Sequence, residues 1–443
     1  MNSKEKSIKK FFLLISTMPL IYVVYKSELV HSGIYRDYYK IYYYFSFILI
    51  ALLSGFYYLK IIYLKYFFII ILSIISALYL FQAYQVFYLS QYYKTKTYFN
   101  ETGKKYDKRE IYEIYLQNIA AGNEKTVSVP PKYFTKKKNV NFHPLSSTSK
   151  SQTIHCNENG YFSEHLTDRY GFNNPDPSWD KEVIDYLIIG DSFARGACVN
   201  RGYDIASQLR KYSKKNVITI GFDSNGPLTS FASLREYSTK KTKSVIWLYH
   251  EGSDLYDLNL EYENKILKKY IDDENFSQNL REKQKLIDET ISKIIKEKIL
   301  ETKKENKNYN QSIKFLKLFY IRNAFFPLRT SSLNLQPDKK FKDVVKAIKN
   351  FTNKNNLDLY FVYLPDYIRY AKKYDNNHSH LKNIEKIIID NKIDFINIDE
   401  LVFKKIDNPF DLFPFKMKGH YNVEGYEKVS KTIFQFIQEK SKQ

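Results

Sequence analysis

The chain has 443 residues, and its 69 lysines and arginines exceed its 48 aspartates and glutamates to give a formal net charge of +21. This length predicts two or three domains with ample room for a buried core. Two cysteines exclude a disulfide-rich mini-scaffold and a four-thiolate zinc site. The charge raises the question of nucleic acid, but the general richness in Lys, Tyr, Phe, Ile and Asn points to an AT-rich coding bias. No nucleic-acid partner is expected.

Three uncharged stretches dominate the first ninety residues, at 11–25, 41–59 and 66–93. The second and third are long enough to cross a hydrocarbon core, which takes about 20 apolar residues. The first is short, but the lysines that flank it can snorkel to the interface. Residues 1–93 are therefore predicted to form a membrane anchor of three transmembrane helices, with the lipid bilayer as partner.

Basic residues predict the orientation of this anchor. Lysines cluster before the first stretch, and Lys60 and Lys65 lie between the second and the third. Both clusters should be cytoplasmic. This places the rest of the chain outside the cytoplasm, at an inner (cytoplasmic) membrane. In the alternative interpretation the first stretch is a cleaved signal peptide. No small-x-small cleavage site follows Tyr25, and the C-terminal part lies on the same side in either case.

The remaining chain has the pattern of an α/β domain. Residues 94–150 are polar and basic and are predicted to be an extracytoplasmic spacer with little core of its own. In residues 151–443, helical patterns separate five apolar runs, at 186–189, 217–220, 245–249, 359–364 and 395–398. Near-continuous apolar strands that alternate with helices predict a parallel sheet covered on both faces. A helical insertion at about 261–327 is expected to lie on its own domain, with a partner-binding or oligomerising helix as the alternative.

Two residues at turns suggest nucleophilic catalysis. Ser192 follows the first run in Gly190-Asp191-Ser192-Phe193, where a strand-to-helix turn can project its hydroxyl above the sheet edge. Alone, this sequence is also an ordinary capped turn. His420 lies in a loop before the final helical pattern and can supply the general base that a serine nucleophile needs.

Two further turns occupy positions where donors to an oxyanion would be needed. Ser224 lies in the turn after the second run, and Ser253 lies in the turn after the third. Each turn by itself is equally well explained as plain βα turn chemistry.

Together these four segments resemble the blocks of the SGNH (GDSL-type) hydrolase superfamily over roughly residues 183–440. With the Cys-Asn-Glu-Asn-Gly-Tyr segment at 156–161 and the Asp-Arg-Tyr-Gly-Phe-Asn-Asn segment at 168–174, the chain resembles membrane-anchored bacterial SGNH-like proteins associated with surface polysaccharides. The resemblance implies a flavodoxin-like three-layer domain, with Ser192 as nucleophile and His420 as base. It implies oxyanion donors from the Ser192 N–H, the Ser224 turn and the Ser253 side chain.

The sequence departs from the family pattern at three positions. Ser253 stands where an asparagine is usual, and Ser224 stands where a glycine is usual. Met417 replaces the aspartate expected three residues before the histidine. Asp411 is the nearest upstream carboxylate and a weak candidate, and a backbone carbonyl is the alternative for orienting the imidazole. The third member of the catalytic triad therefore stays open.

The two cysteines are predicted to pair. Outside the cytoplasm, a chain with only two cysteines often joins them. A Cys156–Cys198 disulfide would hold the arm around residue 156 across the helix after Ser192, with two buried thiols as the alternative. The histidines show no metal-ligand spacing and no phosphate loop is present, so neither a metal nor a cofactor is expected.

The leading hypothesis is a membrane-anchored extracytoplasmic serine esterase or O-acyltransferase that acts on acyl esters, with acetyl favoured, of a glycan or glycolipid. Hydrolysis and transfer share one acyl-enzyme, so the sequence leaves both open. The alternative is a catalytically inactive SGNH-like module that binds or scaffolds surface-polysaccharide assembly components. A third hypothesis is a domain that positions a membrane acyltransferase partner.

Overall fold

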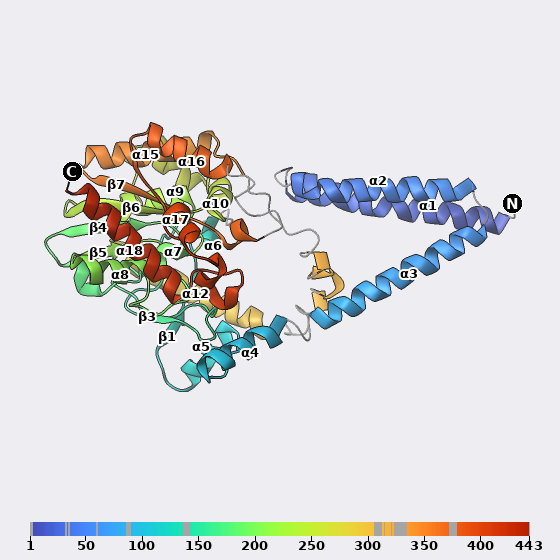
Figure 1. Cartoon of the computed structure of the whole chain (residues 1–443), viewed down its shortest axis with the longest axis horizontal. Coiled ribbons are helices and arrows are strands. Elements are labelled where there is room, and N and C mark those ends of the chain that lie inside the picture. The colour runs from blue at the N-terminus through green and yellow to red at the C-terminus, as the bar shows by residue number, and fades with distance from the viewer. Residues whose placement is uncertain are drawn as a thin grey trace. The chain divides into compact units, whose positions relative to one another are not determined.

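The computed structural model describes residues 3–31, 33, 36–58, 61–85, 90–135, 142–304, 312–313, 315–319, 321–322, 335–371 and 379–442 (Figure 1). The chain divides into two compact units. The first comprises Met1–Gln91 and Lys307–Arg329, and the second comprises Tyr92–Asn306 and Thr330–Gln443.

The first unit is built from long apolar helices. They are α1 (Ser3–Val24), which continues as a π-helix η1 (Tyr25–Val30), α2 (Arg36–Tyr58) and α3 (Ile61–Tyr84). By length and composition, Glu5–Val30 and Lys65–Tyr84 could each cross a membrane. The apolar part of α2, Tyr39–Gly55, is shorter. Two candidate spans are therefore evident in the described residues, where the sequence predicted three.

The second unit contains the expected parallel sheet. Its five strands lie in the order β5-β4-β6-β7-β8 and every pair is parallel. The strands are β4 (Ile184–Ile189), β5 (Val217–Thr219), β6 (Thr242–His250), β7 (Asp358–Leu364) and β8 (Asp394–Asn397). The mixed α/β fold predicted from the apolar runs is thus confirmed.

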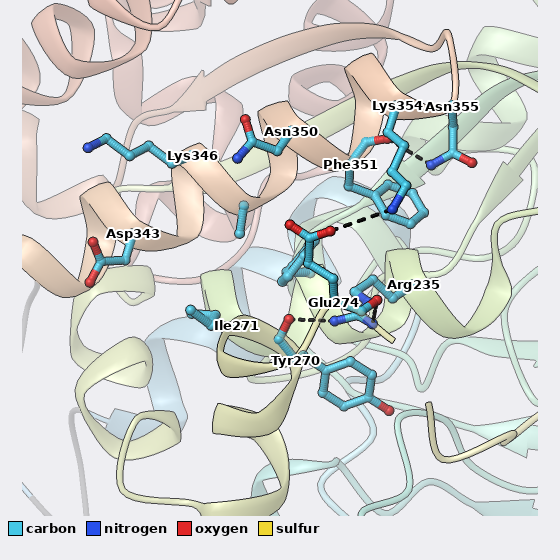
Figure 2. A pocket seen from close by; sticks show the side chains of 12 residues that line it. Arg235, Tyr270, Ile271, Glu274, Asp343, Lys346, Asn350, Phe351, Lys354 and Asn355 are labelled. Atoms are coloured by element: carbon cyan, nitrogen blue, oxygen red, sulfur yellow. Dashed lines mark hydrogen bonds and ion pairs between the residues drawn. The ribbon is translucent and has the colours of Figure 1, made fainter. Parts of the chain in front are cut away.

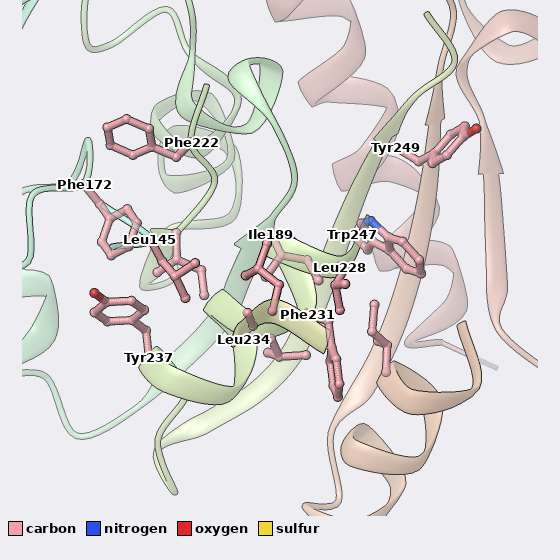
Figure 3. Packing of buried hydrophobic residues seen from close by; sticks show 14 of the residues in the cluster. Leu145, Phe172, Ile189, Phe222, Leu228, Phe231, Leu234, Tyr237, Trp247 and Tyr249 are labelled. Carbon is pink, nitrogen blue, oxygen red and sulfur yellow. The ribbon is translucent and has the colours of Figure 1, made fainter. Parts of the chain in front are cut away.

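Helices cover both faces of this sheet. On one face lie α9 (Pro227–Tyr237), α15 (Lys339–Lys354) and α16 (Ser379–Asp390), and on the other lie α8 (Ile205–Ser213) and α18 (Val423–Lys440). Alternate residues of β6 enter opposite cores. Trp247 packs with Ile189, Leu228 and Phe231 (Figure 3). Leu248 belongs to the core on the other face, with Ile205 and Leu209 of α8. Burial on both faces explains why the strand sequences are continuously apolar rather than alternating.

The segment expected as a spacer belongs to the folded unit. Its elements are α4 (Ser90–Thr102), α5 (Ile111–Ala120), β1 (Lys125–Val127) and α6 (Lys132–Thr135), and residues 136–141 lie outside the described residues. Ile114, Val127 and Phe134 are buried in the main core. The expectation of little core between 94 and 150 therefore does not hold, because a few well-spaced apolar residues among many lysines are enough to anchor the segment.

A small second sheet follows. β1 pairs in parallel with β2 (Gln152–Ile154), which pairs in antiparallel with β3 (Glu164–Leu166). The loop between β2 and β3 carries residues 155–163 and returns the chain toward the main sheet.

The helical insertion packs on the second unit as far as α12 (Gln284–Lys304), whereas its described residues from 312 onward belong to the first unit. It begins after α10 (Asp254–Glu261) and contains α11 (Lys265–Asp272) and α12. Its apolar positions are buried in the main core, namely Leu280, Ile287, Ile291, Ile294 and Ile295. Residues 305–311, 314, 320 and 323–327 of the expected insertion lie outside the described residues.

Candidate active site

A tight turn presents Ser192 at the carboxyl end of β4. Gly190 has a φ of +144°, and a Cβ there would lie 2.6 Å from the carbonyl oxygen of Leu248. The Asp191 carboxylate accepts a hydrogen bond from the N–H of Phe193 at 2.9 Å and so caps the one-turn helix α7 (Ser192–Arg195). This turn places Ser192 at the edge where parallel sheets bind their ligands.

The loop before α18 brings His420 to this serine. Asn422 caps α18 by accepting from the N–H of Gly425 at 2.9 Å, and the buried Tyr421 donates to the Pro365 carbonyl at 2.7 Å. With the loop fixed on both sides, His420 Nε2 lies 2.8 Å from Ser192 Oγ. The structure therefore brings together the two residues that the sequence singled out as nucleophile and base.

The carboxylate beside the histidine is Glu158. Its two oxygens lie 3.1 Å from His420 Nδ1, and one of them accepts the backbone N–H of His420 at 2.6 Å. Because a carboxylate only accepts hydrogen bonds, Nδ1 carries the proton and Nε2 is free to accept from the Ser192 hydroxyl.

Asp411 does not serve this role. Its carboxylate pairs with Lys416 at 2.8 Å and accepts from Asn408 at 3.0 Å, and its backbone carbonyl accepts from Asn422 at 2.7 Å. The weak assignment of Asp411 as a triad member is therefore corrected, because the nearest carboxylate in sequence is held in its own loop.

Charge and burial oppose each other at this pair. Burial favours neutral forms of both groups, but the negative charge of Glu158 and its hydrogen bonds raise the pKa of His420 above its usual value. Despite burial, the charge of His420 and its hydrogen bonds lower the pKa of Glu158. The pair therefore stabilises the imidazolium that forms when a base takes a proton from serine.

A disulfide positions Glu158. It joins Cys156 to Cys198, six residues beyond the nucleophile, and Asn159 donates to the Cys198 carbonyl at 2.9 Å. Asn157 donates to the Asp107 carbonyl at 2.8 Å, so Glu158 lies in a loop tied down on each side. Glu158 was not among the site residues predicted from the sequence. Its place two residues from Cys156 was the available signal, since the predicted disulfide already drew that segment toward Ser192.

Glu158, Cys198 and His420 also form a cluster of metal-ligand types. The sulfur of Cys198 is bonded to Cys156, so it offers no thiolate. What is left is a histidine–carboxylate pair with a serine on the other ring nitrogen, which suits proton transfer.

Two backbone N–H groups remain available beside Ser192. Within the described residues, neither Ser192 nor Ser224 donates its N–H to an acceptor. The second turn is held against the first because Phe222 N–H donates to the Gly190 carbonyl at 3.2 Å. Ser224 has a φ of +60°, the left-handed conformation that explains the usual glycine at this position.

The hydroxyl of Ser253 is engaged by its neighbours. Its Oγ lies 2.9 Å from His250 Nδ1 and 3.3 Å from a carboxylate oxygen of Asp191. On the other side of the ring, His250 Nε2 lies 3.4 Å from Asp366 Oδ2. When Nδ1 carries the hydrogen, Ser253 accepts from it and donates its own hydrogen to the Asp191 carboxylate. When Nδ1 is bare, Ser253 donates to it.

A buried ion pair that the sequence analysis did not anticipate links the two turns. Arg195, fully buried three residues after Ser192, pairs with Asp223, and its guanidinium also donates to Ser128 Oγ at 2.9 Å. Although burial opposes ionisation, Arg195 keeps the pKa of Asp223 well below its usual range. Because Asp223 precedes Ser224, this pair fixes the second turn relative to the nucleophile.

A cavity of about 460 Å³ lies away from this chemistry (Figure 2). The carboxyl-terminal parts of α9 and α15 line it, and these ends lie toward the amino ends of the strands because the helices run antiparallel to the sheet. Arg235 is already used there, since it donates to the Asp273 carbonyl at 2.9 Å. The cavity is therefore not part of the serine site.

No family model matches the sequence, and no curated protein does. Among solved structures, the chain is similar to a protein assigned to the G-D-S-L lipolytic family from Desulfitobacterium hafniense DCB-2. The identity is 12%, the match covers 57% of this chain and 98% of the other, and the TM-score is 0.31. It is also similar to the psychrotrophic esterase EstA from a Pseudoalteromonas species, with 10% identity, coverage of 58% and 99%, and a TM-score of 0.30. Scores this low leave the chemistry to be argued from the site itself.

Proposed function

We propose that this chain is a membrane-anchored extracytoplasmic serine esterase or O-acyltransferase. The observation that carries the proposal is the continuous relay from Ser192 Oγ through His420 to Glu158, with hydrogen-bond distances at both ring nitrogens. A half-buried ring held in one tautomer by a carboxylate, with its free nitrogen on a serine hydroxyl, is the arrangement that activates serine.

In the proposed reaction His420 Nε2 takes the Ser192 proton as Oγ attacks the acyl carbonyl carbon. Glu158 stabilises the resulting imidazolium, and the carbonyl oxygen becomes a tetrahedral oxyanion. Collapse breaks the ester bond, and His420 returns the proton to the leaving alcohol. Water or a sugar hydroxyl then attacks the acyl-serine by the same steps, which releases a carboxylic acid or forms a new ester.

The oxyanion is proposed to accept from the N–H groups of Ser192 and Ser224. Ser253 is proposed as a third donor in the state where His250 Nδ1–H donates to its oxygen. Its hydrogen is then not held by the ring, and it would turn from the Asp191 carboxylate, 3.3 Å away, to the oxyanion. The support is the 2.9 Å contact between the Ser253 and His250 side chains. A hydroxyl oriented by a histidine would thus replace the usual asparagine amide.

The membrane part of the proposal keeps three spans, α1, α2 and α3, with the N-terminus, Lys60 and Lys65 on the cytoplasmic side. It is supported by the apolar stretches and flanking lysines. An extracytoplasmic site favours glycan or glycolipid esters, acetyl above all, as substrates. A C-terminal alkaline phosphatase fusion is expected to be active, whereas the matching GFP fusion is expected to be dark. The reverse result would contradict this topology.

Fluorophosphonate labelling of the full chain in nanodiscs tests the chemistry. The wild type is expected to be labelled, and Ser192→Ala and His420→Ala are expected to lose the label. Ser213→Ala, which removes a hydroxyl from the end of α8, serves as the control and should label normally. A folded wild type without label would favour the non-catalytic scaffolding module.

A further inference from the structure

A second cavity lies beside the catalytic loops. Its volume is about 420 Å³, and its walls come from α4, the loop at 159–161, the turn η8 (Pro414–Lys416) and the first residues of α18. Asn159 and Asn422 contribute to the lining. Asn159 follows Glu158 directly and Asn422 lies two residues after His420, so the cavity shares its wall with the loops that carry the proton relay. We refer to it as the Tyr98 cavity.

Three aromatic rings, together with Pro414 and Val423, make up the apolar part of the lining. Tyr98, Tyr161 and Phe415 all line the cavity, and the rings of Tyr98 and Phe415 meet edge to face with centroids 6.2 Å apart. The Tyr98 ring also lies directly against Gly160, where a Cβ would collide with it. This contact places the aromatic wall two residues from Glu158.

Polar and charged groups accompany the rings. The Tyr98 side chain is only 7% exposed, but its hydroxyl reaches solvent. Within the described residues this hydroxyl has no hydrogen-bond partner. The hydroxyl of Tyr161, which is partly buried, likewise meets no partner in the described part of the chain. Glu101, Lys104 and Glu424 add charged groups to the same lining.

This combination fits one class of ligand. A pyranose ring presents a C–H face that packs on aromatic rings, and its equatorial hydroxyls require donors and acceptors around the rim. An alkyl chain would leave the two phenolic hydroxyls without partners, at a desolvation cost. The volume lies within the range of small-molecule sites, which is about 300–1,000 Å³.

We propose that the Tyr98 cavity is a carbohydrate subsite, which binds one sugar unit of an oligosaccharide while an acyl ester on the same molecule reaches Ser192. This inference rests on the proposed function for its catalytic consequence, but the binding of sugar to the cavity does not depend on turnover. Because Asn159 and Asn422 line the cavity, a sugar bound there lies next to the loops that hold Glu158 and His420.

The binding test uses the full chain in nanodiscs, because maltoside detergents themselves carry a sugar. Saturation-transfer NMR with xylotetraose, chitotetraose and maltotetraose is expected to detect binding of at least one of them. Phe415→Leu, which keeps apolar volume but removes the ring, and the double variant Tyr98→Phe/Tyr161→Phe, which removes only the two hydroxyls, are expected to weaken it. Tyr262→Phe is the matched control, since that hydroxyl donates to Asp343, a residue that lines the other cavity.

The kinetic test compares two substrates. Loss of one aromatic or hydroxyl contact is expected to lower kcat/KM on acetylated oligosaccharide about tenfold. The value for p-nitrophenyl acetate, which is too small to need the subsite, is expected to stay within about twofold. Normal folding of each variant is checked by its Tm, which does not require an active serine.

The outcomes separate the two proposals. Sugar binding that depends on these residues, in a protein that hydrolyses no ester, would support the subsite and contradict the proposed function. Turnover of p-nitrophenyl acetate with no sugar binding, or with variants that bind as the wild type does, would overturn the subsite alone. If the variants lost activity only on p-nitrophenyl octanoate, which has a long acyl chain, the cavity would be an acyl-chain pocket. That result would also overturn the carbohydrate subsite.

Discussion

Glu158 and His420 are separated by 262 residues, yet the carboxylate of Glu158 accepts hydrogen bonds from both the ring Nδ1, at 3.1 Å, and the backbone N–H, at 2.6 Å, of the histidine. The ring bond fixes the tautomer, and the backbone bond fixes the loop. A single carboxylate thus orients the proposed base and anchors the segment that carries it.

Replacing Glu158 by glutamine should test this orientation. The amide can donate to Nδ1 and favour the wrong tautomer, so kcat is expected to fall by roughly 10²–10⁴ with KM little changed. Asp411→Asn removes a charge from the same region without touching the ring and should retain wild-type kcat. Equal losses in the two variants, measured on p-nitrophenyl acetate, would contradict the assignment.

The pH dependence should follow the His420 pKa. Only neutral His420 can accept the Ser192 proton, so kcat/KM is expected to rise as the pH passes upward through its pKa. The neighbouring charge raises that pKa above the usual 6.5. In Glu158→Gln the charge is lost, and the acid limb of the profile should move to lower pH. A limb at the same pH in both proteins would show that Glu158 does not control the titration.

Reduction of Cys156–Cys198 should lower activity by releasing the Glu158 loop. Wild-type kcat is expected to drop at least tenfold in reductant, and Tm should fall because a native disulfide contributes about 2–4 kcal/mol. The variant Cys156→Ala/Cys198→Ala is the control, since it should have the low rate already and be insensitive to reductant. Full activity after both thiols are shown to be free would rule out this role.

Ser253→Ala should reveal whether its hydroxyl serves the oxyanion. Loss of one such donor is expected to lower kcat by about 10²–10³, with KM nearly unchanged. Ser253→Asn, which introduces an amide donor at the same position, should recover a large part of the rate. Steady-state kinetics below the melting temperature decide the point, and an alanine variant with wild-type kcat would leave only the two backbone donors.

Ser224→Gly should stabilise the protein without slowing it. A left-handed conformation costs a non-glycine residue about 1–2 kcal/mol, and glycine relieves this cost. Part of the gain is offset because glycine has a greater conformational entropy in the unfolded state. We expect a net gain of about 0.5–1 kcal/mol, visible as a small rise in Tm, with kcat unchanged because the N–H stays in place. A lower Tm would mean that the Ser224 side chain contributes contacts that outweigh the strain.

Much of this protein is determined by local sequence patterns. The apolar runs that became β4, β6 and β7 identify the parallel sheet, because strands buried on both faces must be apolar at every position. Ser192 and His420 could be chosen from their turns, since the edge of a parallel sheet is where such turns converge. The cysteine pair followed from the number of cysteines and the expected compartment.

The tertiary structure alone decided the remaining parts. Glu158 lies in a loop with no regular pattern, and its contact with His420 exists only because the Cys156–Cys198 bond and the Asn159–Cys198 hydrogen bond bring that loop onto the nucleophile helix. The partners of the Ser253 hydroxyl likewise depend on how three strand ends meet. Local patterns report which face of an element is buried, whereas contacts between distant loops depend on the packing of the whole domain, and no short stretch of sequence encodes that packing.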